Sequence, residues 1–291
     1  MKIRPARSSD REEILSFCVG TFSWGDYIDR VWDYWYKSGQ LLVVEDVGRK
    51  IAVSHVAVCP NGKGMWLEGV RVHPDYRRSR IATDLIAKMI QYGLQKGAKK
   101  ASAIVDVTNV ASQRMMEKNG FEIVSRWAFY VAGDRQKKKK SNARLAIAAE
   151  LDDVWRYLQN SEIYRLSAKR YVKSWHWYAL DKNVLRNFIR EKSVIVAGRP
   201  IDGIAMINRR GYWDRANIIQ IVYLDSASTS SLYHLVSFAT NLYLDGGFEE
   251  LQIVCHDSRR LTSFIEKSMI KDEEQFLLYD KVFTARAVPY R

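Results

Sequence analysis

Cysteine is scarce in this chain of 291 residues, which contains three cysteines: Cys18, Cys59 and Cys255. An odd number of widely separated cysteines argues against a disulfide framework and against a zinc site of the CxxC type. We therefore expect no metal centre, and the simplest prediction is that all three are small residues of the hydrophobic core.

Long hydrophobic runs are missing as well. No segment approaches the run of about 18 apolar residues that marks a membrane helix, and the opening "MKIRPARSSDREEIL" turns polar at once. The sequence thus predicts a soluble, cytoplasmic protein with neither a membrane span nor a secretory signal. Hydrophobic residues make up 47% of the chain, enough for one large core or two ordinary ones, and the length favours two domains.

Acidic residues are in short supply, because 33 Asp and Glu face 46 Lys and Arg, giving a formal charge of +13. Such a charge attracts anions, whether nucleotide cofactors, nucleic acid or acidic proteins. Part of the excess lies in "GDRQKKKKSN", residues 133–142. A run of like charges stays solvated, so we expect a basic linker between domains at 1–132 and 143–291, with a nucleic-acid contact as the alternative.

The pattern of apolar residues predicts an α/β fold with a mixed sheet. Three successive strands indicate an antiparallel meander, and helical spacing of apolar positions begins at Ile81 and ends near Gly97. The expected strands are 2–6, 40–46, 50–59, 65–72, 101–107 and 121–131, and the expected helices are 8–18, 26–39, 81–97 and 109–120.

The second half of the chain repeats this order. Sliding the sequence by 149 residues places Gly246 on Gly97 and Glu266 on Glu117, and the same sequence of strands and helices follows. Matched identities and matched element order together favour a tandem duplication. Opposite "RRSRIA" (77–82) the second copy has "SASTSS" (226–231), without arginine. We therefore expect one active domain and one degenerate domain.

Three stretches of the first half, taken in order, resemble the GCN5-related N-acetyltransferase (GNAT) superfamily. "IRPARSSDREEI" is similar to the first strand and helix of that family, "VRVHPDYRRSRIA" to its acetyl-CoA signature, and "NVASQRMMEKNGF" to a later helix of the type N-x-x-A-x-x-L-Y-E-K-x-G-F. The resemblance covers nearly all of residues 1–131. It implies two tandem GNAT-like acyl-CoA N-acyltransferase domains, of which the first binds acetyl-CoA as a co-substrate.

Physical reasoning supports an anion site at the start of the helix near Ile81. The first N–H groups of a helix have no partner within it, and with the helix dipole they attract phosphate. The resemblance implies that strand residues Val70, Arg71 and Val72 pair with the pantetheine arm and that Asn109 and Ser112 contact it from the other side. The pyrophosphate is expected at Arg77, Arg78, Ser79, Arg80, Ile81, Ala82 and Thr83.

Two departures from the family pattern concern this site. Arg80 stands where the loop has its first glycine, and it either adopts an ordinary dihedral or bears strain of about 1 kcal/mol. Because the start of a helix does not require a positive φ, we expect weakened or rearranged binding rather than its loss. Met116 stands where the family frequently has the tyrosine thought to reprotonate the thiolate, and methionine has no proton to donate.

Glu68 is the candidate general base, since period-two alternation places it on the same strand face as Val70 and Val72. A carboxylate acting through water can deprotonate an ammonium before it attacks a thioester. The alternative is that Glu68 only pairs with a cation on the sheet. His55 and His73 are the next candidates.

The acceptor site is expected in "TFSWGDYIDRVWDYWY", residues 21–36, which the family commonly uses for this purpose. Asp26, Asp29 and Asp33 recur at helical spacing and form either an acidic stripe toward an amine or, as we favour, a solvated face opposite an aromatic core stripe. In the second half, "KSWHWYALD" (173–181) is expected to fill that domain's core or an interface.

The sequence as a whole predicts an acetyl-CoA-dependent N-acetyltransferase in which an amine of a small molecule or protein attacks the thioester directly. One alternative is a non-catalytic acyl-CoA-binding or regulatory module, which Met116 and Arg80 favour. The other is a basic nucleic-acid-binding protein, but no aromatic-basic motif supports it.

Overall fold

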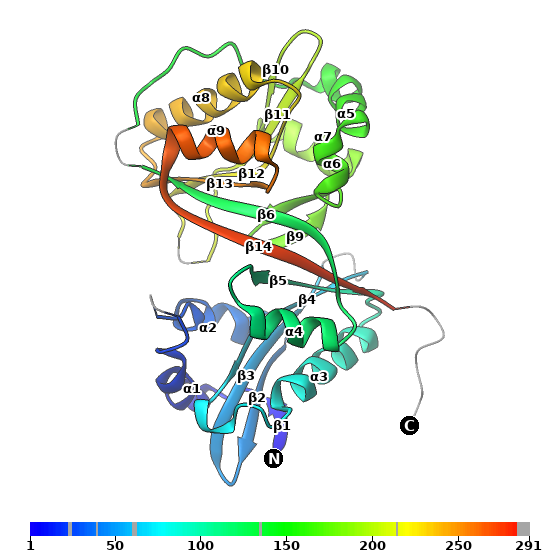
Figure 1. Cartoon of the computed structure of the whole chain (residues 1–291), viewed down its shortest axis with the longest axis vertical. Coiled ribbons are helices and arrows are strands. Elements are labelled where there is room, and N and C mark those ends of the chain that lie inside the picture. Colours follow the sequence, from blue (N-terminus) through cyan, green and yellow to red (C-terminus); the bar gives the residue numbers. More distant parts are fainter. Residues whose placement is uncertain (23–24, 39, 60–62, 134–135, 214, 284–291) are drawn as a thin grey trace. The chain divides into compact units, whose positions relative to one another are not determined.

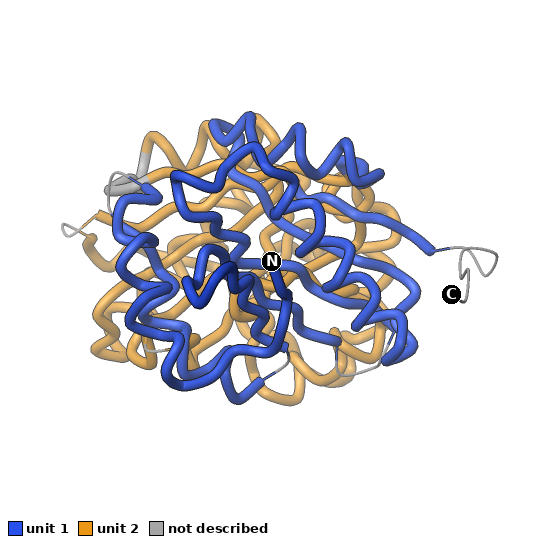
Figure 2. The backbone as a smooth tube through the Cα atoms, turned by 90° about the horizontal axis from the view of Figure 1, so that it is seen from below, with its two compact units in different colours: residues 1–123, 278–291 blue, residues 124–277 orange. Residues whose placement is uncertain are grey.

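The chain divides into two compact units, shown in different colours in Figure 2. In this computed structural model, the residues described are 1–283 except 23–24, 39, 60–62, 134–135 and 214. Unit 1 comprises residues 1–123 together with 278–291, and unit 2 comprises residues 124–277. Each unit is described by itself.

Unit 1 has the element order that the apolar pattern predicts, so the α/β class is confirmed (Figure 1). Its strands are β1 (Lys2–Pro5), β2 (Gln40–Asp46), β3 (Arg49–Val58), β4 (Met65–Val72), β5 (Lys100–Asp106) and the start of β6 (Glu122–Ala132). Its helices are α1 (Arg11–Cys18), α2 (Ile28–Lys37), α3 (Ile81–Gln95) and α4 (Val110–Lys118), with short 3-10 turns η1 (Ser8–Asp10) and η2 (Pro74–Tyr76).

The sheet of unit 1 runs β1-β2-β3-β4-β5, and the end of β14 (Ile270–Val282) lies beside β5. The first three pairings are antiparallel and β4–β5 is parallel. Helix α3 packs on β3 and β4, and its side chains Leu85, Ile86 and Met89 are completely buried. Gly93 faces Met65 so closely that an added Cβ would lie 2.3 Å from the methionine Cε, so any larger residue there would require the Met65 side chain to shift.

Unit 2 follows the same order with an insertion after its second helix. Its strands are β7 (Arg144–Leu145), β8 (Arg170–Lys173), β9 (His176–Ala179), β10 (Val194–Ala197), β11 (Gly203–Asn208), β12 (Ile218–Ser226) and β13 (Glu250–His256). Its helices are α5 (Leu151–Asn160), α6 (Glu162–Leu166), α7 (Lys182–Arg190), α8 (Thr229–Gly246) and α9 (Arg259–Met269), with the turn η3 (Ala148–Glu150). The hairpin β8–β9 and α7 form the insertion.

β6 and β14, the last strands of the two halves, each pair with strands from the other half of the chain. In unit 2 the strand order is β14-β6-β13-β12-β11-β10-β7, and β6 pairs antiparallel with β13, Tyr130 opposite Ile253. In unit 1 the end of β14 is fixed to β5, where Ser102 Oγ donates to Asp280 Oδ1 at 2.7 Å. These units therefore differ from the expected domains 1–132 and 143–291, which follow simple chain order.

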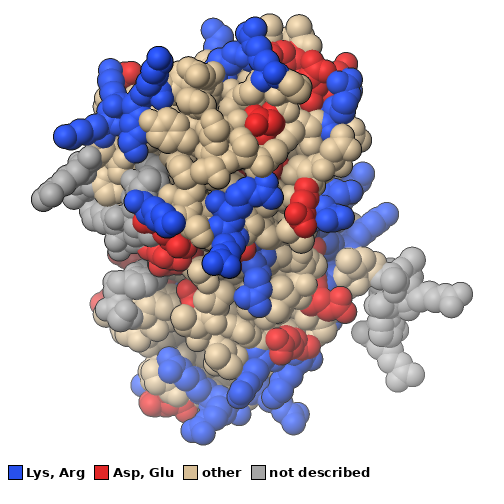
Figure 3. All heavy atoms as spheres, turned by 45° about the horizontal axis from the view of Figure 1, so that its top comes forward, with Lys and Arg blue, Asp and Glu red and all other residues tan. Residues whose placement is uncertain are grey.

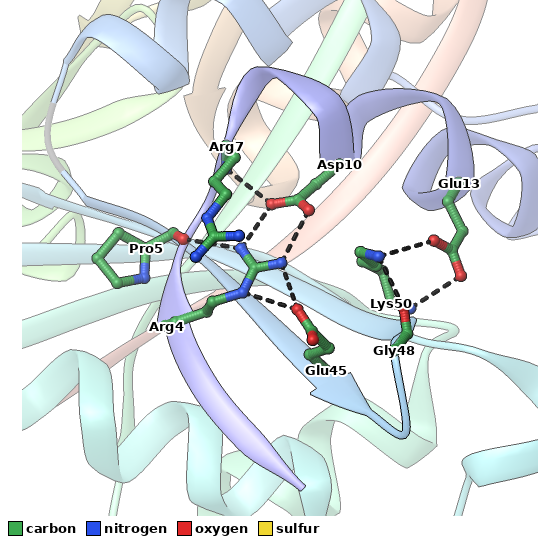
Figure 4. Close-up of polar contacts among 8 residues, drawn as sticks. All are labelled: Arg4, Pro5, Arg7, Asp10, Glu13, Glu45, Gly48 and Lys50. Carbon is green, nitrogen blue, oxygen red and sulfur yellow. Dashed lines mark hydrogen bonds and ion pairs between the residues drawn. The ribbon is translucent and has the colours of Figure 1, made fainter.

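A buried ion pair fixes the start of unit 1 (Figure 4). The Arg4 guanidinium donates to both oxygens of Asp10, at 2.7 and 2.8 Å, and Asp10 also accepts the backbone N–H of Arg7 at 2.7 Å. Arg4 reaches Glu45 on β2 as well, at 2.6 Å. The Arg4 guanidinium holds the pKa of Asp10 below its usual range. These bonds join β1, η1 and β2 into one corner of the sheet.

Unit 2 contains the same arrangement at its own start. Arg144 donates to Glu150 at 2.7 Å and pairs with its other oxygen at 2.5 Å, and the backbone N–H of Ile147 donates to Glu150 at 3.1 Å. Arginine and carboxylate are six residues apart in both units. A duplicated polar contact of this detail is independent of the apolar pattern that first indicated a repeat.

The basic segment before unit 2's first strand lies along α8. Asn241 binds both backbone groups of Lys139, at 2.8 and 3.0 Å, and Lys138 pairs with Asp245. The side chains of Lys137 and Lys140 are exposed, as expected of a basic linker. On the face shown in Figure 3, Lys and Arg form several separate groups with Asp and Glu between them, not one continuous track.

Three further expectations concern the cysteines, the aromatic cluster of residues 173–181 and membrane-spanning helices. Cys18 and Cys255 are buried core residues as expected, whereas Cys59 is only half-buried. The aromatic cluster of 173–181 lies inside unit 2, where Trp175 contacts the rings of Phe129 and Tyr212. None of the helices in the described part of the chain is both long and apolar enough to cross a bilayer.

Candidate active site

A bulge in β4 shapes the candidate site. The ladder between β3 and β4 shifts register between Val53 and His55, so that β4 carries one extra residue there. Gly69 lies in the bulge with φ +66, and a Cβ at this position would lie 2.5 Å from the ring of the fully buried Trp35. Only glycine combines this dihedral with so close an approach, so Gly69 and Trp35 together fix the bend of the strand.

Beyond the bulge, β4 and β5 part. Their registered pairs in the described residues are Met65 with Ala101 and Trp66 with Ser102, near the start of both strands. The His73 N–H donates to Ile51 on β3 at 2.8 Å, so by alternation the backbone of Arg71 also faces β3, whereas Val70 and Val72 face the opened edge. Of the three strand residues expected to pair with the pantetheine arm, Val70 and Val72 thus have backbone groups at the opened edge, whereas those of Arg71 face β3.

Glu68 is held by a buried histidine. His55 Nδ1 lies 2.8 Å from Glu68 Oε1, its Nε2 lies 2.6 Å from the Ser38 carbonyl oxygen, and its ring stacks on Trp35 at 4.9 Å. Because a carbonyl only accepts, Nε2 carries a hydrogen, and a neutral His55 then presents Nδ1 as an acceptor toward a carboxyl group. One proton must therefore lie between His55 and Glu68.

Arg71 uses its side chain to hold the segment before α2. Its guanidinium binds Asp26 through two contacts, at 2.6 and 3.2 Å, and lies over the rings of Phe22 and Tyr27. Burial raises the pKa of Tyr27. The Asp26 side chain is 4% exposed, so it belongs to the framework of the site and is not part of an acidic stripe.

The solvated-face alternative fits the other two carboxylates of this segment. Asp29 and Asp33 are exposed, and Asp29 pairs with Arg11 at 2.8 Å. Trp32 and Trp35 are buried on the opposite face of α2. Trp24 of the same segment lies outside the described residues.

The arginine loop precedes α3 with unusual backbone geometry. Arg78 and Arg80 have φ +66 and +65, and Arg80 is the residue before the helix, with ψ 0. The expectation that this position needs no positive φ is wrong. The loop turns through the left-handed region where the family pattern has glycine, at a cost of about 1 kcal/mol or more for each arginine.

This geometry leaves the start of α3 open. The first hydrogen bond within the helix runs from Asp84 N–H to the Arg80 carbonyl at 3.0 Å, and the Arg80 side chain caps nothing. The N–H groups of Ile81, Ala82 and Thr83 therefore point out of the helix end. The side chains of Arg77, Arg78, Ser79 and Arg80 are exposed around them.

Asn109 caps α4 as the sequence predicts. Its Oδ1 accepts the Ser112 N–H at 3.0 Å, so the two predicted residues contact each other. Met116 is buried in the same helix, 4% exposed. In the described contacts, Glu68 with His55, Val72 with Arg77, and Asn109 with Ser112 form three separate groups.

Sequence reasoning missed three parts of this site. Trp35, Gly69 and the Asp26–Arg71 pair set the shape of β4, yet each is separated in sequence from its partner by tens of residues. The signal available for Gly69 was a glycine inside a strand pattern, which often marks a bulge or a close approach. The expected aromatic core stripe of residues 21–36 contains Trp35, but its contact with Gly69 was not predicted.

Comparison with known proteins finds a match to a family model within unit 1. Residues 10–121 match the model of the acetyltransferase (GNAT) family. The type 1 aminoglycoside N(6')-acetyltransferases of Salmonella typhimurium and Salmonella enteritidis are each 32% identical over 76 residues, which are 26% of this chain and 52% of each relative. The chain thus spans about half the length of the curated relatives it matches.

Solved structures resemble the whole chain. A GCN5-related N-acetyltransferase from Sphaerobacter thermophilus has a TM-score of 0.62 at 14% identity, covering 97% of this chain and 95% of its own. Another from Kribbella flavida has a TM-score of 0.50 at 12% identity, covering 97% and 70%. At such identities the likeness establishes the fold, and it extends over both units.

Proposed function

Because residues 10–121 match the model of the GNAT acetyltransferase family, we propose that the chain transfers an acetyl group from acetyl-CoA to an amine. The observation that carries the proposal is the separation of β4 from β5 after Trp66, which leaves a strand edge open directly before the anion site at the start of α3. An extended amide-containing chain ending in phosphates fits such an edge and such a helix end.

The residues present fit coenzyme A. The N–H groups of Ile81, Ala82 and Thr83 would hold the pyrophosphate, with the exposed guanidiniums of Arg77, Arg78 and Arg80 adding positive charge. The backbones of Val70 and Val72 would pair with the pantetheine amides, and Asn109 and Ser112 would bound the other side. The bound thioester supplies the activated acetyl group.

Glu68, paired with His55, would receive the proton of the attacking ammonium through water. The Ser38 carbonyl fixes the hydrogen on His55 Nε2, and one proton already lies between Nδ1 and Glu68 Oε1. The proton gained from the ammonium would therefore be taken by the other carboxylate oxygen, Oε2, with Nδ1–H donating to Oε1. Trp35 stacks on the imidazole and keeps its plane fixed. Met116 cannot reprotonate the leaving thiolate, so solvent or another group must do so.

The acceptor in this proposal is an amine of a small molecule or protein. The aminoglycoside acetyltransferases named above make aminoglycosides a sensible first test, and polyamines and peptide amines extend the range. The exposed carboxylates Asp29 and Asp33 lie on α2, in the segment expected to line the acceptor site.

The test joins calorimetric titration with acetyl-CoA and CoA to a thiol-release assay over this amine panel. We expect one acetyl-CoA bound per chain, and for Glu68→Gln a kcat lower by about 10²–10⁴-fold with acetyl-CoA affinity retained. Glu12→Gln, which removes an exposed carboxylate from α1, is the matched control.

Each result has a defined meaning. Acetyl-CoA binding without thiol release on any amine would favour the non-catalytic acyl-CoA-binding module. Full activity of Glu68→Gln would remove this residue from the proton path while leaving acetyl transfer intact. Absence of acetyl-CoA binding would refute both the enzyme and the module.

A further inference from the structure

Unit 2 contains a cavity of about 680 Å³ that is open to solvent on one side. Its walls come from α5, the start of α6, the turn between β10 and β11, and the end of β12. This volume lies within the range of about 300–1,000 Å³ typical of small-molecule sites. All of its lining residues belong to unit 2, so the cavity is separate from the candidate active site.

Asp225 lies at the end of β12 in this cavity and is 1% exposed. Its carboxylate accepts three hydroxyl groups, from Tyr157 at 2.9 Å, Ser161 at 2.5 Å and Tyr223 at 2.9 Å. Within the described residues no cation lies within ion-pair distance of it. Burial raises the pKa of Asp225. A buried carboxylate with hydroxyl partners alone is costly to keep ionised.

Two guanidiniums of the same cavity are also without a carboxylate. Arg260 donates to the carbonyl oxygens of Ser226 and Ala227, at 2.9 and 3.1 Å, and Arg199 lies on the β10–β11 turn. Neither forms an ion pair among the described residues. The other two arginines of the lining are already paired with carboxylates that also line the cavity, Arg144 with Glu150 and Arg156 with Asp153.

Within the described residues, the Asp225 carboxylate thus shares this cavity with the guanidiniums of Arg199 and Arg260 but forms no ion pair with either. Arg260 is near enough for its charge to lower the pKa of Asp225, yet it binds backbone carbonyls instead. Charges kept apart across a space of ligand size are complementary to a molecule that carries both signs. An ammonium group would complete the partners of Asp225, and a carboxylate matches the fork of a guanidinium.

We propose that the cavity of unit 2 binds a free α-amino acid, with its ammonium at Asp225 and its carboxylate at Arg260 and Arg199. The apolar walls formed by Ile163, Ile201 and Ala227 would take its side chain. Glu162 and Asn160 also line the cavity and add polar contacts at its margin.

A second acetyl-CoA is a poor occupant, because the start of α8 is closed. Ser228 caps the helix by accepting the Ser231 N–H at 3.1 Å, and both hydroxyl groups bind the carboxylate of Asp202. A carboxylate therefore already occupies the helix end where a phosphate would bind. The occupant of the cavity must differ from the cofactor of unit 1.

The experiment measures binding of each of the twenty L-α-amino acids to the full chain, by thermal shift and then by calorimetry. We expect at least one to bind, and its carboxamide and its N-acetyl derivative to bind at least about tenfold more weakly, since each loses one charge. Asp225→Asn and Arg260→Gln should each weaken binding by at least about tenfold, whereas Glu191→Gln, which removes an exposed carboxylate of unit 2 outside the cavity lining, should not change it.

The proposal is overturned if no amino acid binds at 10 mM, about 10⁴-fold above a micromolar Kd, or if the amide and N-acetyl forms bind equally well. Retained affinity in both variants would also overturn it. Arg260 is exposed, so Arg260→Gln keeps the test decisive even if Asp225→Asn does not fold. The binding measurements do not depend on acetyl transfer, so their outcome can be interpreted even if the proposed enzyme activity is not found.

Discussion

Replacing Arg80 with glycine should stabilise the protein, although it removes a side chain. Arg80 has φ 65 and ψ 0, in the left-handed region. A residue with a Cβ loses about 1–2 kcal/mol there, and glycine loses about 0.4–1 kcal/mol through the greater freedom of its unfolded chain. The difference predicts a free energy of unfolding higher by about 0.5–1 kcal/mol.

Two neighbouring arginines provide matched controls. Arg78 has φ 66, so Arg78→Gly should be stabilising to a similar extent. Arg77 has φ −65 and ψ 155, an ordinary extended conformation, so Arg77→Gly should be destabilising by about 0.4–1 kcal/mol. All three side chains are exposed and each substitution removes one positive charge. Arg77→Gly additionally loses the donation of Arg77 Nε to the Val72 carbonyl at 3.4 Å, so the comparison of Arg80→Gly with Arg78→Gly reports the backbone effect most directly.

The measurement is thermal unfolding followed by tryptophan fluorescence and circular dichroism, whose agreement tests for a single transition. A gain of 0.5–1 kcal/mol corresponds to about 1–4 °C in a chain of this size. If Arg77→Gly gains as much as Arg80→Gly, backbone strain is not the cause. If Arg80→Gly is destabilising, the side chain makes a contribution that its exposed position does not explain.

Two further predictions concern the sheet of unit 1. Gly69→Ala should destabilise by about 2–5 kcal/mol, from the positive φ and from overpacking, measured by urea unfolding; Trp35→Leu in the same chain should recover the overpacking part, and strictly additive effects would disprove the clash. Asp10→Asn should cost about 3 kcal/mol, because it breaks the buried pair with Arg4 while Glu45 remains. Since the pKa of Asp10 is lowered by folding, its stabilisation is complete above the unfolded pKa of about 4 and is lost as pH falls through the folded value. The variant should therefore lose less stability on acidification, and an equal loss would contradict this.

Local sequence patterns were sufficient for most elements. The spacing of apolar residues from Ile81 predicts α3, and Asn109 predicts the start of α4, because helical periodicity and capping act over a few residues. The meander β2–β3–β4 follows from turn residues between apolar runs. The same locality explains why Glu68 could be placed on β4 before its partner His55 was known.

Features that depend on distant contacts were not accessible. The positive φ of Arg80 reflects the path from β4 to α3, which the residue type disfavours. The exchange of β6 and β14 between units requires knowledge of which edge each strand meets. The gapless register of 149 residues also misled, since residues 73–80 separate β4 from α3 while only 227–228 separate β12 from α8. The comparison of residues 77–82 with 226–231 therefore set the loop before α3 against the end of β12 and the start of α8.

The two matching arginine–carboxylate pairs support a duplication more firmly than the sequence shift of 149 residues did. Arg4 with Asp10 and Arg144 with Glu150 share a separation of six residues and the same added backbone N–H bond, a coincidence that apolar patterning alone does not produce. The helices that follow the meanders of the two units differ at their starts. α3 begins at an open end ringed by arginines, whereas α8 begins at a serine cap closed by Asp202. The start of α3 therefore leaves N–H groups available to an anion, whereas in unit 2 the charged groups that lack an ion-pair partner lie in the cavity around Asp225.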